Sequence, residues 1–136
     1  MNLTRIAALA AGLLLADIAF AHLPGLAKPD ILLSQVVSGM PSGEKQEIRV
    51  FKAVFNPLDK TVFHTHRFPV TVFVQEGAFT LELEGRPPVV VKAGEAYVEP
   101  PNVKMTGYNR SGTEELRVLI FYVSDPDTPF LDVPEK

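Results

Sequence analysis

Two of the three histidines in the chain stand two positions apart, in the triplet His64-Thr65-His66. In an extended chain, side chains at positions i and i+2 project from the same face, about 6.5 to 7 Å apart along the strand. Two imidazoles at that spacing can lean onto one metal ion. Because the chain has no cysteine, thiolate catalysis, iron–sulfur clusters and cysteine-containing zinc sites are excluded. Any metal site must use nitrogen, oxygen or thioether ligands.

The rest of the sequence offers no other catalytic constellation. It contains no G-x-S-x-G nucleophile elbow, no phosphate-binding P-loop, no G-x-G-x-x-G dinucleotide motif and no H-E-x-x-H zinc motif. The 13 basic and 16 acidic residues give a net charge of -3, and no basic stretch could follow a phosphate backbone. Nucleic acid is therefore not expected as a partner.

The first 21 residues have the composition of an export signal. Arg5 precedes an uninterrupted apolar run over residues 6–15, and Ala19 and Ala21 occupy the small-residue positions of a cleavage site before His22. The run is shorter than the roughly 20 apolar residues of a membrane span. We therefore expect a signal peptide, export to the periplasm or the extracellular space, and no membrane span in the mature chain. An anchoring N-terminal helix is the alternative.

Residues 22–136 are expected to form one all-β domain. Twelve prolines and nine glycines interrupt the chain often, and apolar and polar residues alternate strictly over residues 79–84, as in a strand with one buried face. Even spacing of short apolar runs favours a sandwich or a small antiparallel barrel. The tail 124–136, with three prolines, is expected to be an extended arm. The runs that we expect to be strands are residues 31–37, 48–55, 70–74, 79–83, 89–91, 96–98 and 116–123.

The first histidine-containing segment resembles a motif of the cupin superfamily. That motif runs glycine, five residues, H-x-H, three residues, glutamate, six residues, glycine. His64, His66 and Gly77 are in register with it, whereas Leu58 stands at the first glycine and Val70 at the glutamate.

The second cupin motif is matched in the same partial way, so that the resemblance covers about residues 57–109. Gly94, Pro100 and Asn109 are in register, whereas Asn102 replaces a glycine and Met105 replaces the histidine. The resemblance implies a jelly-roll β-barrel, pairing into homodimers, and a metal ion held in the barrel mouth.

Mapped onto this chain, the cupin ligands become His64, His66 and Met105. The carboxylate of the 2-His-1-carboxylate arrangement is absent at Val70, and two imidazoles with a thioether suit a soft ion, which points to copper. Glu99 could supply a substitute carboxylate, although a solvated surface position is the simpler expectation for it.

The remaining expectations concern a small organic ligand in the lumen. Tyr97, Tyr108 and Tyr122, together with Glu99, are candidates to contact it. The first functional hypothesis is a metal-binding barrel with oxidoreductase activity. The alternatives are a metal-free barrel that binds or senses a small molecule, in which Met105 fills the core, and an isomerase or lyase with a histidine as base.

Overall fold

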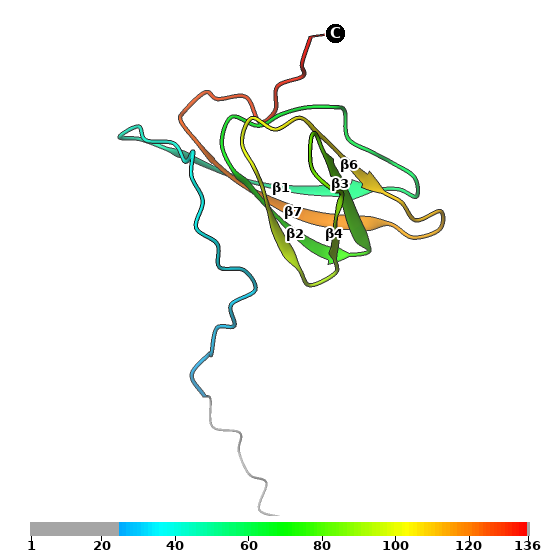
Figure 1. The fold of residues 1–136 in the computed structure, drawn as a ribbon. Coiled ribbons are helices and arrows are strands. Elements are labelled where there is room, and N and C mark those ends of the chain that lie inside the picture. Colours follow the sequence, from blue (N-terminus) through cyan, green and yellow to red (C-terminus); the bar gives the residue numbers. More distant parts are fainter. Residues whose placement is uncertain (1–24, 136) are drawn as a thin grey trace, which may run out of the picture.

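A computed structural model describes residues 25–135 of the chain, and the predicted signal peptide, residues 1–21, lies outside the described residues. The described part is all-β, and its strands form two antiparallel sheets. Figure 1 shows β1, β7 and β2 of the larger sheet side by side, with β3, β4 and β6 in the other layer. The large sheet has the order β1-β7-β2-β5 and the small sheet the order β4-β3-β6. The strands are β1 Glu47–Phe55, β2 Val70–Glu76, β3 Ala78–Leu83, β4 Val89–Lys92, β5 Ala96–Glu99, β6 Met105–Asn109 and β7 Leu116–Ser124.

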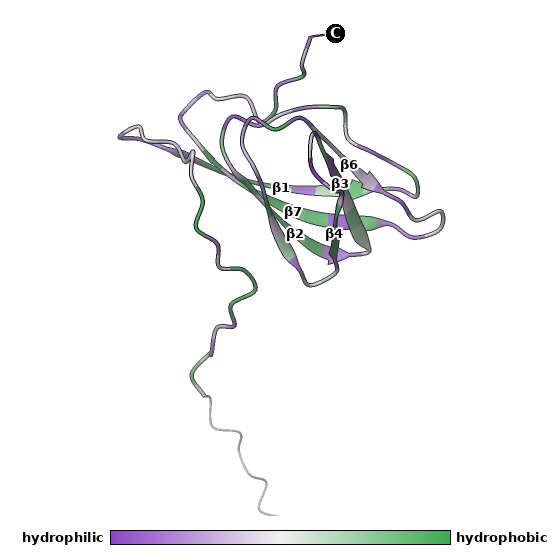
Figure 2. Ribbon diagram, viewed as in Figure 1, coloured by the Kyte–Doolittle hydropathy of each residue, from purple (hydrophilic) through white to green (hydrophobic). Residues whose placement is uncertain are grey.

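The core lies between the two sheets, as the alternating pattern of the strands predicts. On β3, Phe79, Leu81 and Leu83 are buried, whereas Ala78 before them and Glu82 between the last two are exposed. Figure 2 shows apolar residues along much of β2 and β7. This burial is the main favourable term in the stability of the domain. The buried apolar residues are Val70, Val72, Val74, Phe79, Leu81, Leu83, Val91, Met105, Leu116, Val118 and Tyr122.

The strands differ from the expected ones in two places. Residues 31–37 are extended but pair with no strand of the described chain, because β-propensity needs a neighbouring strand before it becomes a ladder. Strand β6, Met105–Asn109, was not expected, because the inward position Gly107 interrupts its apolar pattern. A Cβ at Gly107 would overlap the Phe79 ring of β3, so the glycine permits the close approach of the two strands.

The connection between β1 and β2 crosses from the large sheet to the small sheet. Isolated bridges pair Lys60 with Tyr108 and His64 with Met105, so the connection runs beside β6. Leu58, at its start, has φ 68°, and Asn102, after β5, has φ 58°. Both stand where the cupin motifs have glycine, and both adopt the left-handed conformation that glycine adopts most readily.

The C-terminal segment, residues 125–135, packs back onto this connection. Asp132 pairs through its backbone with Thr65, and its carboxylate accepts hydrogen bonds of 2.8 and 2.9 Å from the Arg67 guanidinium. The segment therefore lies across the end of the barrel where the histidines are. Within residues 25–135, no helix has the length and apolar character to span a membrane.

Candidate metal centre

Three buried side chains meet at the barrel end beneath the C-terminal segment. His64 and His66 come from the β1–β2 connection and Glu99 from the end of β5, and their exposed fractions are 5%, 1% and 4%. One potential ligand atom from each residue lies within 4.8 Å of the other two. The His64 and His66 Nε2 atoms are 3.1 Å apart, and the His66 Nε2 atom is 3.2 Å from the Glu99 Oε2 atom.

Both histidines are held in one tautomer by backbone carbonyls. His64 Nδ1 donates to the Val62 carbonyl at 2.7 Å, and His66 Nδ1 donates to the Phe130 carbonyl at 2.6 Å. Because a carbonyl only accepts, each Nδ1 carries the proton, and each neutral ring presents a lone pair at Nε2. Two lone pairs at 3.1 Å repel. The arrangement therefore requires a cation between the rings, either a proton on one of them or a metal ion bound to both.

The distances fit a metal ion. Two ligands about 2.0 to 2.1 Å from one ion, at octahedral or tetrahedral angles, lie roughly 2.8 to 3.4 Å apart. The separations of 3.1 and 3.2 Å from His66 Nε2 to its two neighbours fall in that range. The Nδ1 contacts to carbonyls are the outer-shell hydrogen bonds that orient metal-bound imidazoles in proteins. The three residues are therefore of the right type for a transition-metal site, and the two separations from His66 and the orientation of both imidazoles are consistent with one.

Glu99 replaces the carboxylate that the first motif lacks. Val70 stands at the glutamate position of that motif, and the register of β2 with β5 places Glu99 directly opposite Val70. Directly opposed residues of an antiparallel pair project from the same face, so the carboxylate reaches the lumen from the neighbouring strand. The expectation that Glu99 is a solvated surface residue is therefore wrong, as is the inference that the site lacks a carboxylate.

Burial governs the electrostatics of the cluster. It lowers the pKa of His64 below 6.5, and the positive form of His66 would lower it further, whereas the Val62 carbonyl and the Glu99 carboxylate act in the opposite direction. The lowered pKa keeps His64 neutral near pH 7, which is the state that binds metals. Burial likewise raises the pKa of Tyr122.

A small cavity of about 50 Å³ adjoins the cluster. Apart from Thr61 and the cluster itself, its lining is apolar, so water has few partners in it. Phe130 and Leu131 of the C-terminal segment are part of the lining, and the Phe130 ring centroid lies 4.8 Å from that of His66. The cavity is lined by Phe55, Thr61, His64, His66, Val72, Phe79, Glu99, Val118, Ile120, Phe130 and Leu131.

Met105 is the third predicted ligand, and the structure places it beside His64. The two residues exchange backbone hydrogen bonds of 3.0 and 2.8 Å, and Met105 is fully buried. It belongs to the apolar core and is not among the residues that line the cavity. Its role as a ligand stays a prediction.

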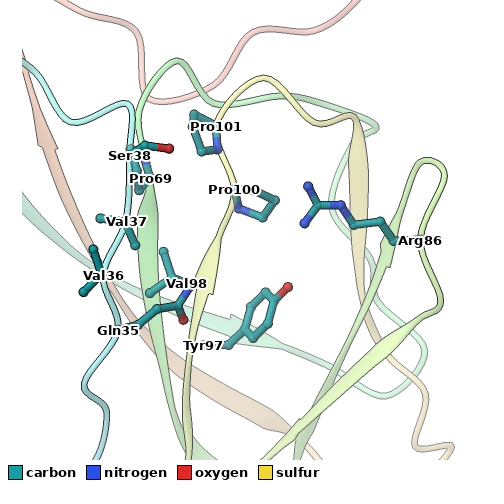
Figure 3. A pocket seen from close by; sticks show the side chains of 10 residues that line it. All are labelled: Gln35, Val36, Val37, Ser38, Pro69, Arg86, Tyr97, Val98, Pro100 and Pro101. Carbon is teal, nitrogen blue, oxygen red and sulfur yellow. The ribbon is translucent and has the colours of Figure 1, made fainter.

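The three tyrosines lie in different surroundings. Tyr122 is fully buried with its ring centroid 6.0 Å from that of His66. Tyr97 packs against the edge of the core and lines a groove beside β5, together with Arg86, as Figure 3 shows. Tyr108 stacks under the Arg110 guanidinium, 3.8 Å from its ring centroid. Of the three, only Tyr122 is next to the histidines.

The sequence alone did not reveal two contributions to the site. The Phe130 carbonyl belongs to the backbone, which no residue type discloses. Thr61 contacts the cluster at long range, with its hydroxyl 3.5 Å from His64 Nδ1, and accepts a hydrogen bond from the Gly107 amide at 2.9 Å. The position of Thr61 three residues before His64 is the one signal that could have suggested it.

Comparison with known proteins identifies the fold. The family model described as "Cupin domain" matches residues 51–122, which is more than half of the chain. No curated protein matches the sequence.

Solved structures agree with this assignment. A cupin-like protein from Thermotoga maritima is 24% identical with a TM-score of 0.55, and the match covers 65% of each chain. An RmlC-like cupin from Methanocaldococcus jannaschii is 21% identical with a TM-score of 0.53, over 76% of this chain and 87% of that one. The DMSP lyase DddQ from Ruegeria pomeroyi is 17% identical with a TM-score of 0.55, and this chain spans 42% of its length and aligns over 63% of its own. The chain thus spans less than two thirds of the first and the last of these proteins.

Proposed function

Since the chain belongs to the cupin domain family, we propose that it binds one transition-metal ion through His64, His66 and Glu99. The carrying observation is the pair of Nε2 lone pairs held 3.1 Å apart by Nδ1 hydrogen bonds to carbonyls. Glu99 adds one negative charge to two neutral imidazoles. Two histidines with one carboxylate suit divalent iron, manganese, zinc or copper and leave positions open for a further ligand.

Copper is the finer form of the proposal, and it depends on Met105. A thioether favours Cu(I) over the harder divalent ions, and Met105 pairs with His64 at the backbone. With Met105 as a fourth ligand the site would prefer copper, and without it the carboxylate would favour a divalent ion. The substitution Met105→Leu distinguishes the two forms, because it should weaken binding of copper only if Met105 is a ligand.

The chain's own residues define what the site can do. The Val62 and Phe130 carbonyls hold both imidazoles with their lone pairs inward, and the apolar lining excludes water. The cavity of about 50 Å³ has room for a ligand of only a few atoms beside the cluster. A bound metal would supply Lewis-acid or one-electron chemistry. Oxidoreductase activity on a small molecule is therefore part of the proposal.

Metal analysis tests it directly. The chain is stripped with chelator, dialysed against iron(II), manganese(II), zinc or copper, and assayed for bound metal. We expect one ion per chain, lost in the His64→Ala/His66→Ala variant and retained in His22→Ala, which removes the third histidine. Selective loss of copper in Met105→Leu would identify copper. A wild-type chain that binds no more metal than the double variant would refute the site.

A histidine-dependent lyase or isomerase is the second candidate. It is favoured by the neutral, buried His64, whose lowered pKa leaves a lone pair free to accept a proton near pH 7. One fold-level neighbour is described as a DMSP lyase, but fold alone does not carry an activity. Turnover of a small substrate that persists in chelator and disappears in His64→Ala would favour this candidate over the metal site.

Export is also part of the proposed function. It rests on Arg5, the apolar run 6–15 and the Ala19 and Ala21 positions. When the full gene is expressed in a bacterium, the protein recovered from the periplasm should begin at His22 by mass spectrometry. Recovery of an uncut chain from the cytoplasm alone would contradict the proposal.

A further inference from the structure

Arg49 is a charged side chain on the otherwise apolar inner face of β1. The inner positions that follow it on this strand are Phe51, Ala53 and Phe55. The Arg49 guanidinium lies over the buried Tyr122 ring, 5.1 Å from its centroid, and the Arg49 side chain is 24% exposed. A charge inside a fold is costly unless it is paired or hydrogen-bonded. The partners of Arg49 therefore indicate what this position can bind.

The hydrogen bonds of Arg49 leave its charge without a close carboxylate. Its Nη2 donates to the Thr128 carbonyl at 2.7 Å and to the Ser124 hydroxyl at 2.9 Å. Within residues 25–135, the nearest carboxylate is that of Glu47, 3.5 Å from Nε, and Nε forms no hydrogen bond. Neutral oxygens thus stand where a carboxylate would accept charge-assisted hydrogen bonds.

Strand register connects Arg49 to the histidine cluster. Arg49 stands opposite Tyr122 on β7, and Tyr122 stands opposite Val70 on β2. Val70 in turn stands opposite Glu99 on β5. Because neighbouring strands are about 4.8 Å apart, this inner row is roughly 14 Å long at the backbone. It has a guanidinium at one end and, at the other, the carboxylate that adjoins His66.

The C-terminal segment lies over this row. The Thr128 carbonyl accepts a hydrogen bond from Arg49, and the Phe130 carbonyl accepts one from His66. The Phe130 ring packs among three aromatic rings, with centroid distances of 4.5, 4.8 and 5.6 Å to Phe51, His66 and Tyr122. The segment therefore places an aromatic ring in the row and, two residues before it, an oxygen acceptor on the guanidinium.

The C-terminal segment can leave the barrel without breaking a strand. It follows β7, and its backbone pairs with the barrel at one bridge, where Thr65 and Asp132 exchange two hydrogen bonds of 2.9 Å. Its three prolines lack the amide hydrogen that a longer ladder would need. The ion pair of Asp132 with Arg67 is exposed, and such pairs contribute little. Local opening of the segment therefore costs less than unfolding the domain.

The size of the cavity requires such an opening for any organic ligand. The cavity beside the histidines measures about 50 Å³, and Phe130 and Leu131 form part of its lining. Pockets for organic ligands are typically about 300 to 1,000 Å³. Displacement of the C-terminal segment removes these two side chains and joins the cavity to the row that ends at Arg49.

We propose that the barrel binds a small aromatic carboxylate in place of the C-terminal segment. The ligand's carboxylate takes the position of the Thr128 carbonyl on Arg49, and its ring takes the position of the Phe130 ring beside His66. Residues i and i+2 of an extended chain are about 6.5 to 7 Å apart, so a few methylene groups between ring and carboxylate match both positions. His66 Nδ1 then donates to water. As a substrate class for the metal centre, this inference rests on the proposed function.

Isothermal titration of the metal-stripped chain with phenylbutyrate tests the guanidinium. We expect the wild type to bind the acid at least about 10-fold more tightly than the uncharged phenylbutyramide, because hydrogen bonds to charged groups are worth that much. Arg49→Gln should abolish this preference, and Arg49→Lys should restore part of it. Arg117→Gln, which removes an outward arginine of β7, is the matched control. A wild type that binds neither compound, or both equally, would overturn the proposal, as would loss of the preference in Arg117→Gln.

A reversible disulfide tests whether the C-terminal segment must move. Residues that exchange both backbone hydrogen bonds, as Thr65 and Asp132 do, have Cα atoms about 5.5 Å apart, a separation that a disulfide spans. Because the chain has no cysteine, the variant Thr65→Cys/Asp132→Cys contains only the introduced thiols. We expect its oxidised form to bind phenylbutyrate at least about 10-fold more weakly than its reduced form, since only the open state binds. Equal affinity of the two forms would overturn the proposed displacement.

Metal analysis of the same samples separates this inference from the proposed metal site. A chain that prefers the acid through Arg49 but binds no metal would support the carboxylate site and refute the metal proposal. A chain that binds metal but does not distinguish the acid from the amide would refute the carboxylate site and leave the metal proposal standing.

Discussion

The two sheets share one core but differ on their outer faces. The small sheet presents Thr80, Glu82, Lys92 and Tyr108 outward, with the exposed Val90 as an apolar residue among them, and such a mainly polar face is expected in water. The large sheet presents mainly valine, leucine, isoleucine and phenylalanine. Its inner face also provides Glu99 to the histidines. The large sheet thus carries the proposed site on its inner face and apolar residues on its outer face, whereas the small sheet provides packing and a mainly polar surface.

The largest expected effect is on metal affinity, which should depend on the inner face of the large sheet and not on that of the small sheet. Glu99→Val removes a ligand on the large sheet, and metal affinity should fall at least about 100-fold, the upper range for loss of an outer-shell partner. The swapped variant Val70→Glu/Glu99→Val returns a carboxylate to the opposite position on β2 and should recover part of the affinity. Isothermal titration with the metal that the wild type binds measures both.

A control on the small sheet shows whether a loss of affinity is specific to Glu99. Leu83→Val, a buried change on the small sheet, is the control and should keep the affinity while reducing the free energy of unfolding. Equal affinity of Glu99→Val and wild type would remove Glu99 from the site.

The second effect concerns packing within the small sheet. Gly107→Ala places a Cβ against the Phe79 ring and should reduce the free energy of unfolding by about 1 to 3 kcal/mol, as overpacked cores do. Gly112→Ala is the matched control, because a Cβ there meets no atom within 4 Å. Urea denaturation compares the two. Equal stabilities would mean that β3 and β6 are packed less closely than described.

A smaller effect distinguishes two exposed ion pairs. Arg67→Gln breaks the exposed pair with Asp132 that links the C-terminal segment to the β1–β2 connection, and we expect a loaded metal to escape to chelator only about 2- to 5-fold faster. Arg110→Gln breaks the pair with Glu82 on the small sheet and should leave the escape rate unchanged. Equal acceleration by both variants would contradict a local role for Asp132.

The same pair should respond to acid. The Arg67 guanidinium lowers the pKa of Asp132 below its ordinary 3.8, so the folded state binds this proton less tightly than the unfolded chain. Its contribution to stability is present above pH 3.8 and is lost as pH falls through the lower, folded-state pKa. Asp132→Asn should remove that part of the acid dependence in a thermal melt series.

The smallest expected effect is on the melting temperature, after a substitution at Leu58 in the β1–β2 connection. Leu58 is 70% exposed with φ 68°. Leu58→Gly relieves about 1 kcal/mol of left-handed strain and loses about 0.5 to 1 kcal/mol of chain entropy. The melting temperature should therefore change by no more than a few degrees. A large loss of stability would show that the Leu58 side chain contributes packing that its 70% exposure does not suggest.

The sequence predicted correctly those strands in which large apolar residues alternate with polar ones. Residues 79–83 alternate strictly, and β3 forms there. Residues 31–37 have equal apolar character but no strand beside them in the described chain. β6 has a weak pattern but pairs with β3 because Gly107 lets the backbone approach Phe79. Local preference therefore predicted a strand where the inward side chains are large, and it failed where a partner was lacking or a glycine faced the core.

The sequence by itself determined the H-x-H pair, the absence of thiolate chemistry and the cupin motif positions. These features depend on residue type and on spacing along the chain. Only the tertiary structure decided that Glu99 stands opposite Val70, that the Phe130 carbonyl orients His66, and that the large sheet has apolar residues on both faces. Strand register and chain crossing bring together residues far apart in sequence, and no local pattern encodes which of them will be neighbours.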